Sequence, residues 1–116
     1  MDPFPEPHEL LSFFSQEPEL AHADTPPFYN TLRFSGRVGE IAYVVRISPS
    51  DRELRLQTQS DQMNVDLAVT DVAGLTVHEG PTESLMMATF SPDSRRGLLK
   101  FRLHPRLEVE WPFEKH

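Results

Sequence analysis

Apolar and polar residues alternate along most of the chain after residue 28, which is the period of β-strands with one buried face. Between 41 and 48, for example, apolar side chains occupy every second position. The alternating segments are separated by short stretches rich in proline, glycine, serine and aspartate, which are typical of turns. The pattern predicts seven strands, at 29–38, 41–48, 53–59, 63–70, 75–78, 84–91 and 98–111, the last of them broken at Pro105.

The N-terminal segment has a helical period instead. Leu10, Phe13 and Phe14 are spaced i, i+3 and i+4, so they share one face of a helix. Pro7 suits the first helical position because its missing N–H would have no partner there. Pro18 disfavours helical geometry in the residue before it. The pattern predicts a helix over 7–16, between a flexible start at 1–5 and a linker at 19–27.

The short turns set the fold class. Neighbouring strands joined by such turns must be antiparallel, and the amphipathic helix is suited to cover part of their buried face. A chain of 116 residues is large enough for one core. We therefore expect a mainly β or α+β fold: a single domain, 1–116, in which an N-terminal helix packs on a curved antiparallel sheet of six to seven strands, with the meander over 28–113.

The distribution of charge suggests what kind of partner the protein binds. The net charge is −7, and residues 1–25 contain six acidic residues and no basic one, which leaves 12 acidic and 11 basic residues for the rest of the chain. Binding to phosphates requires the opposite sign, so nucleic acid is disfavoured as a partner. A basic protein is the electrostatically favoured partner.

Seven acidic residues are the predicted partner-binding site. Five belong to residues 1–25, which we call the N-terminal acidic arm. Two lie on the outward face of the last strand. The seven residues are Glu6, Glu9, Glu17, Glu19, Asp24, Glu108 and Glu110. The alternatives are that the arm only keeps the terminus solvated and that the last pair only decorates an edge strand. Arg95 and Arg96 form a small basic spot, either a soluble hairpin tip or a contact for an acidic partner.

Motifs for catalysis or cofactor binding are missing from the sequence. We find no glycine-rich phosphate loop, nucleophile elbow or metal-binding helix motif. The chain has no cysteine, and its five histidines are scattered. We predict no enzymatic activity, no cofactor, and no catalytic or metal site. No apolar run approaches the roughly 20 residues that span a bilayer, and no secretory signal is visible, so we expect a cytoplasmic protein without membrane contact.

The order of segments resembles a known kind of protein. A paired phenylalanine and a proline–leucine step (FFSQEPEL) precede the meander, which then carries VAGLTVHEG, ESLMMATFS and LLKFRLHPRLEVEW. This order, from Leu10 to Trp111, resembles the small predicted immunity proteins encoded beside toxins in bacterial polymorphic toxin systems. The resemblance implies a role without a site list: to bind one cognate toxin and block it, as a monomer or homodimer. An acidic arm fits a basic, nuclease-like toxin.

Two other functions remain open. A small-ligand-binding β domain would need a pocket, and the aromatic and methionine positions of the strands are its predicted lining: Phe34, Tyr43, Met86, Phe90 and Phe101. A sheet filled by its own side chains would count against this function. An acidic secretion chaperone or adaptor would instead dimerise stably and expose an apolar strip.

Overall fold

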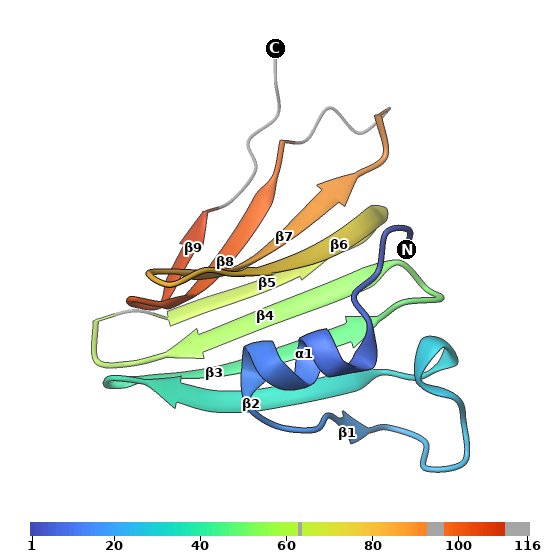
Figure 1. The fold of residues 1–116 in the computed structure, drawn as a ribbon, viewed down its shortest axis with the longest axis horizontal. Helices are drawn as coiled ribbons and strands as arrows, with labels where there is room; N and C mark the ends of the chain where they lie inside the picture. The colour runs from blue at the N-terminus through green and yellow to red at the C-terminus, as the bar shows by residue number, and fades with distance from the viewer. Residues whose placement is uncertain (63, 93–96, 111–116) are drawn as a thin grey trace.

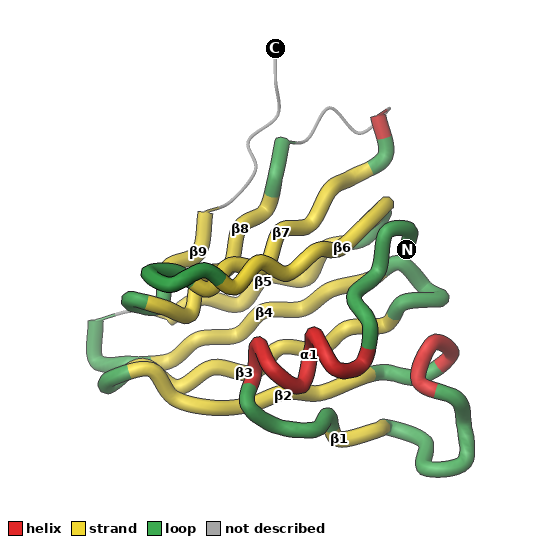
Figure 2. Tube along the Cα trace, in the orientation of Figure 1, coloured by secondary structure: helices red, strands yellow, loops and turns green. Residues whose placement is uncertain are grey.

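The computed structural model describes residues 1–62, 64–92 and 97–110 (Figures 1 and 2). One α-helix, one short 3₁₀ helix (η1) and nine strands follow one another along the described chain. They are α1 (Pro7–Phe14), β1 (Glu19–Leu20), η1 (Pro27–Tyr29), β2 (Leu32–Val38), β3 (Ile41–Ser48), β4 (Glu53–Gln59), β5 (Asn64–Val69), β6 (Val72–Glu79), β7 (Ser84–Phe90), β8 (Leu99–His104) and β9 (Glu108–Glu110). Within the described ranges, no helix is long and apolar enough to cross a membrane.

The strands form two antiparallel sheets. The first has the order β1-β2-β3-β4-β5 and the second β6-β7-β8-β9 (Figure 1). The chain passes from one sheet to the other at Asp71, whose positive φ of 59° lies in the left-handed region. Both α1 and the second sheet pack on one face of the first sheet. Phe14 of α1 stacks on Phe34 at 4.1 Å between ring centroids, and Tyr43 meets Phe101 of β8 edge-on at 5.7 Å.

The buried face of α1 is the predicted one. Leu10, Phe13 and Phe14 are each at most 5% exposed, and they belong to one hydrophobic cluster that also takes in both sheets. The end of the helix is fixed to β2 by Gln16, whose side chain accepts a hydrogen bond from the Ser35 N–H at 3.2 Å and donates one to the Ser35 carbonyl. The predicted fold class, an N-terminal helix on antiparallel β-structure, is confirmed.

The strands differ from the expected ones in number and grouping. Strands 41–48 and 53–59 have the predicted bounds, and the predicted break at Pro105 separates β8 from β9. The connection between the strands predicted at 63–70 and 75–78 is the passage to a second sheet, and the short strand predicted at 75–78 is the longer β6. The alternation of apolar and polar residues indicates which side chains of a strand are buried. It does not indicate to which sheet the strand belongs.

The N-terminal arm is attached more closely than its sequence suggested. Residues 1–5 were expected to be flexible, but the Asp2 N–H donates to the Ala73 carbonyl at 2.9 Å and the Leu75 N–H donates to the Pro3 carbonyl at 2.8 Å. Gly74 allows this approach, because a Cβ there would lie 2.8 Å from the Pro3 Cδ. The expected linker 19–27 contains β1, which pairs with β2. The arm is therefore held against the body at both ends of α1.

Candidate functional site

A groove of about 630 Å³ runs beside α1. Its volume lies in the range typical of ligand and side-chain binding pockets. We call it the α1 groove, and it is lined by Phe4, Pro5, Glu6, Pro7, His8, Leu10, Leu11, Glu17, Pro18, Leu20, Pro27, Phe28 and Leu32. These residues belong to α1, to the segments before and after it, to β1, to η1 and to the start of β2. Most of these side chains are apolar, and only three carry an ionisable group.

Three large apolar side chains of the α1 groove are open to solvent. Leu11 is 43% exposed, Leu20 37% and Phe28 42%, whereas their neighbour Leu10 is only 3% exposed. Exposed apolar surface that is rimmed by polar groups is typical of protein–protein interaction sites. The α1 groove can accept one or two apolar side chains of a partner.

The far wall of the groove is fixed by one buried amide. Asn30, 3% exposed, accepts hydrogen bonds from the His22 N–H at 3.1 Å and the Thr31 N–H at 2.9 Å, and it donates to the Thr25 carbonyl at 3.0 Å. These bonds hold the loop before η1 in one shape. Phe28, carried by η1, meets Phe4 edge-on at 6.4 Å. The loop that forms this side of the groove is therefore held in place by hydrogen bonds.

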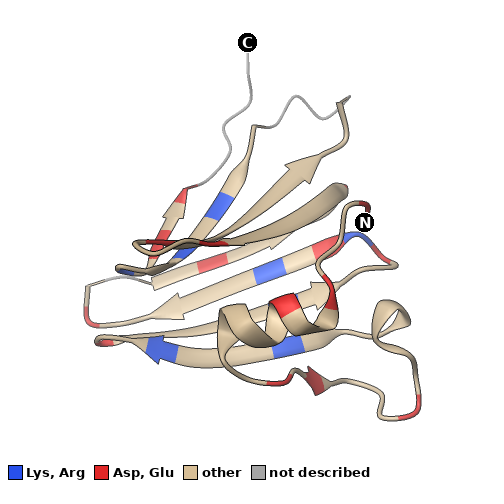
Figure 3. Ribbon diagram, in the orientation of Figure 1, with Lys and Arg blue, Asp and Glu red and all other residues tan. Residues whose placement is uncertain are grey.

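The five arm carboxylates differ in what they do. Glu6 and Glu9 form a capping box at the start of α1, in which the Glu9 Oε1 accepts a hydrogen bond from the Glu6 N–H at 2.9 Å. Glu19 pairs with Arg33 at 3.2 Å. Glu6 and Glu17 line the α1 groove, and Asp24 is exposed on the loop between β1 and η1. Figure 3 shows the acidic residues of the fold in red and the basic ones in blue. Among the described residues, Glu6, Glu17 and Asp24 have no ion-pair partner. The groove thus has an uncompensated acidic rim.

The two glutamates of β9 have a different environment. Glu108 accepts hydrogen bonds of 2.6 Å from Arg106 and from Arg102, and Glu110 lies 3.8 Å from Lys100. The hydrogen bond from Arg106, supported by the charge of Arg102, holds the pKa of Glu108 below its usual range. These carboxylates lie on the edge strand of the second sheet. The structure does not bring them together with the arm.

The predicted ligand pocket is filled by its own side chains. Phe34, Met86 and Phe101 are at most 2% exposed, Tyr43 is 6% and Phe90 8% exposed, and all five belong to the core cluster. Burial raises the pKa of the Tyr43 hydroxyl. The described ranges contain no group of three or more histidine, aspartate or glutamate residues that could hold a metal ion.

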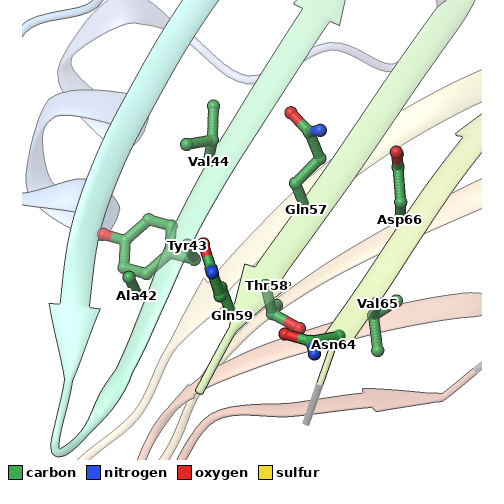
Figure 4. A pocket seen from close by; sticks show the side chains of 9 residues that line it. All are labelled: Ala42, Tyr43, Val44, Gln57, Thr58, Gln59, Asn64, Val65 and Asp66. Atoms are coloured by element: carbon green, nitrogen blue, oxygen red, sulfur yellow. The ribbon is translucent and has the colours of Figure 1, made fainter. Parts of the chain in front are cut away.

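A further hollow of about 340 Å³ lies over β3, β4 and β5, where the amides of Gln57, Gln59 and Asn64 line it (Figure 4). Asp66 lies at its edge and pairs with Arg55 through two hydrogen bonds of 3.1 and 2.9 Å. This hollow combines the amides with apolar side chains such as Val44 and Val65, in contrast to the predominantly apolar α1 groove.

Sequence reasoning missed the apolar half of the site. The partner-binding site predicted from the sequence did not include Leu11, Leu20 or Phe28. The consecutive prolines before Phe28 were the available signal, because they favour a rigid turn that can present the following side chain. Arg95, Arg96 and Trp111, to which the sequence also drew attention, lie outside the described residues.

Comparison with known proteins gives one informative match. No family model and no curated protein matches the sequence. Among solved structures, the chain is similar to a chain of the contact-dependent growth inhibition toxin–immunity protein complex from Klebsiella pneumoniae 342, with a TM-score of 0.74, 13% sequence identity and coverage of 92% of both chains. At this identity the match establishes a shared fold.

Proposed function

We propose that this protein is a non-enzymatic immunity-type inhibitor that binds a cognate toxin through the α1 groove and its acidic rim. The observation that carries the proposal is an open apolar groove with three carboxylates at or near its border, Glu6, Glu17 and Asp24, which have no ion-pair partner among the described residues. The fold shared with a chain of a toxin–immunity protein complex supports the same role. The protein acts in the cytoplasm, as a monomer or homodimer.

The two parts of the site have separate tasks in binding. An apolar side chain of the toxin enters between Leu11, Leu20 and Phe28 and is removed from water, which supplies most of the binding free energy. The carboxylates at the rim attract a basic surface, raise the association rate and disfavour acidic partners. A basic, nuclease-like toxin fits this division, because its phosphate-binding surface would be covered by carboxylates.

The seven predicted contact residues are expected to contribute unequally. Glu6, Glu17 and Asp24 make the main contacts. Glu9 contributes indirectly by capping α1, and the charge of Glu19 is already paired with Arg33. Glu108 and Glu110 remain predicted contacts of lower weight, because arginine and lysine already neutralise them. A partner would have to displace these cations to gain from either carboxylate.

A growth assay tests the proposal. The product of the adjacent gene is expressed alone and together with this protein, and we expect growth arrest in the first case and growth in the second. Leu11→Lys should abolish the rescue, since it places a charge in the groove. Leu98→Lys is the matched control, because Leu98 is equally exposed, at 45%, but lies just before β8 of the second sheet. A harmless neighbour, or arrest caused by this protein itself, contradicts the proposal.

The chaperone or adaptor function predicts a different result. It requires a stable dimer in the absence of any partner, with an apolar strip left exposed for the bound protein. Light scattering of the pure protein then gives twice the monomer mass, and the neighbouring gene product is harmless when it is expressed alone. A monomer whose Leu11 is needed for rescue favours the inhibitor.

A further inference from the structure

The first sheet has a second face that no described helix or strand covers. Its inward side chains contact α1 and the second sheet, while the alternate side chains of β2 to β5 point the other way. Three hollows lie on this outer face, over β2–β3–β4 and β3–β4–β5. We call it the outer face, and its central positions are Arg33, Arg46, Arg55, Val44, Gln57 and Asp66.

A row of arginines crosses the outer face. Arg33 on β2 is directly opposite Arg46 on β3, which is directly opposite Arg55 on β4. Strands are about 4.8 Å apart, so the row extends about 10 Å across three strands. Like charges directly opposite each other destabilise a sheet. In a protein with a net charge of −7, such a row is unexpected unless each charge is compensated.

The positive charges of the two outer arginines are paired with carboxylates, and that of the central arginine is not paired within the described residues. Arg33 pairs with Glu19 at 3.2 Å, and Arg55 forms a bidentate pair with Asp66. Arg46 donates to the neutral Oε1 of Gln57 at 2.5 Å, and its charge acts on Asp66 from beyond ion-pair distance. No described carboxylate lies within ion-pair distance of Arg46. Because a guanidinium has five N–H donors, Arg46 retains the capacity to bind an incoming carboxylate in a bidentate manner.

Arg46 also lies between two hollows. It lines one of about 330 Å³ together with Ser48 and Arg55. Its partner Gln57 lines the hollow of about 340 Å³ shown in Figure 4, along with Gln59 and Asn64. The primary amides can both donate and accept hydrogen bonds, as a peptide backbone requires. The face therefore combines a cationic centre with neutral hydrogen-bonding groups beside it.

We propose that the outer face is a second docking surface, which binds an acidic segment of a protein partner with Arg46 as its carboxylate anchor. Two observations favour a peptide over a nucleic acid. The arginine row is only about 10 Å long, which suits one or two carboxylates. Glu53 and Asp66, which line the hollows on either side, would repel a continuous phosphate backbone, whereas a peptide can place a single carboxylate at Arg46 and neutral residues beside these two. The inference is independent of the α1 groove and of the proposed toxin.

The probe is a six-residue peptide that carries two glutamates among glycines and serines, added to the ¹⁵N-labelled full chain at low salt and followed by NMR. We expect saturable shifts confined to amides of β2, β3 and β4. Arg46→Gln should weaken binding about tenfold, the value of one charge-assisted hydrogen-bonded pair. Arg46→Lys keeps the charge and loses the bidentate geometry, so it should retain part of the affinity.

Arg106→Gln is the matched control, because it removes the same charge from the edge of the second sheet, where the Arg106 side chain is 80% exposed. It should leave binding unchanged. The inference is overturned by absent or scattered shifts, by an equal loss in Arg106→Gln, or by equal binding of a hexathymidylate, which would indicate a general polyanion site. Growth rescue by the α1 groove is a separate readout, so failure of one proposal leaves the other intact.

Discussion

The acidic arm and strand β9 carry the same kinds of residue in different surroundings. Glu108 and Glu110 face arginine and lysine side chains across the sheet, and their charges are neutralised within the fold. Glu6, Glu17 and Asp24 have no ion-pair partner in the described part of the chain, and two of them border an apolar groove. A carboxylate that is paired with a basic residue of the same chain is neutralised within the fold. A carboxylate without such a pair keeps its charge available for a partner protein.

The difference has an energetic basis. Exposed ion pairs contribute little to stability, on the order of 0 to 1 kcal/mol. The paired glutamates of β9 gain that small amount and offer a partner little net charge. The unpaired carboxylates lie in the segments next to the docked helix and keep their full charge in a defined geometry. A flexible arm would have to lose conformational entropy on binding, whereas this arm is already ordered by α1 and β1.

The largest effect is expected from undocking the arm. Phe14→Ala removes a 4%-exposed ring that stacks on Phe34, and it should lower the free energy of unfolding by about 3 to 5 kcal/mol. Leu11→Ala, on the open side of the same helix, should cost less than about 0.5 kcal/mol. Urea denaturation measures both. Similar losses for the two variants would mean that α1 is not fixed by its buried face.

A smaller effect is expected beneath the helix. Gly36 lies under the ring of Tyr43, and a Cβ there would be 2.6 Å from the Tyr43 hydroxyl oxygen. Gly36→Ala should destabilise the fold by about 1 to 3 kcal/mol through overpacking. Gly80→Ala is the control, because its Cβ would meet nothing closer than 3.4 Å. The melting temperatures of the two variants should differ clearly, and equal values would contradict the packing described here.

The smallest effect concerns pH and the paired carboxylates. The pKa of Glu108 is lowered by Arg106 and Arg102, and that of Asp66 by Arg55. Such groups stabilise the folded state above their unfolded pKa, and this contribution is lost as the pH falls through the lowered folded pKa. The free energy of unfolding should therefore decrease as the pH falls below about 4.5, the ordinary pKa of glutamate.

The pH dependence can be assigned with a pair of variants. Glu108→Gln and Asp66→Asn should each flatten the decline in melting temperature between neutral and acidic pH. An unchanged slope in both variants would show that these ion pairs do not contribute.

The sequence predicts the local structure well, and the site only in part. The bounds of β3 and β4 and the buried stripe of α1 follow from periodicity alone, because each depends on which side chains avoid water. Strand β1 has two exposed residues and therefore no period to detect. Its pairing with β2 is a tertiary contact, as is the passage to the second sheet.

The acidic half of the α1 groove was predictable from charge, whereas its apolar half depends on how η1 and β1 fold back toward α1. The arginine row on the outer face was hidden for a similar reason. Arg33, Arg46 and Arg55 are 13 and 9 residues apart in the sequence, and only the strand register places them side by side. The proximity of the three arginines therefore cannot be predicted from their spacing in the sequence without knowledge of the strand register.

The most direct test of the central claim is the salt dependence of affinity for the neighbouring gene product, measured by calorimetry. One variant neutralises the arm (Glu6→Gln, Glu17→Gln, Asp24→Asn), and the other neutralises β9 (Glu108→Gln, Glu110→Gln). The arm variant should bind at least about tenfold more weakly at low salt and lose most of its salt dependence, while the β9 variant should stay within about twofold of the parent protein. Equal losses, or a larger loss in the β9 variant, would contradict the claim.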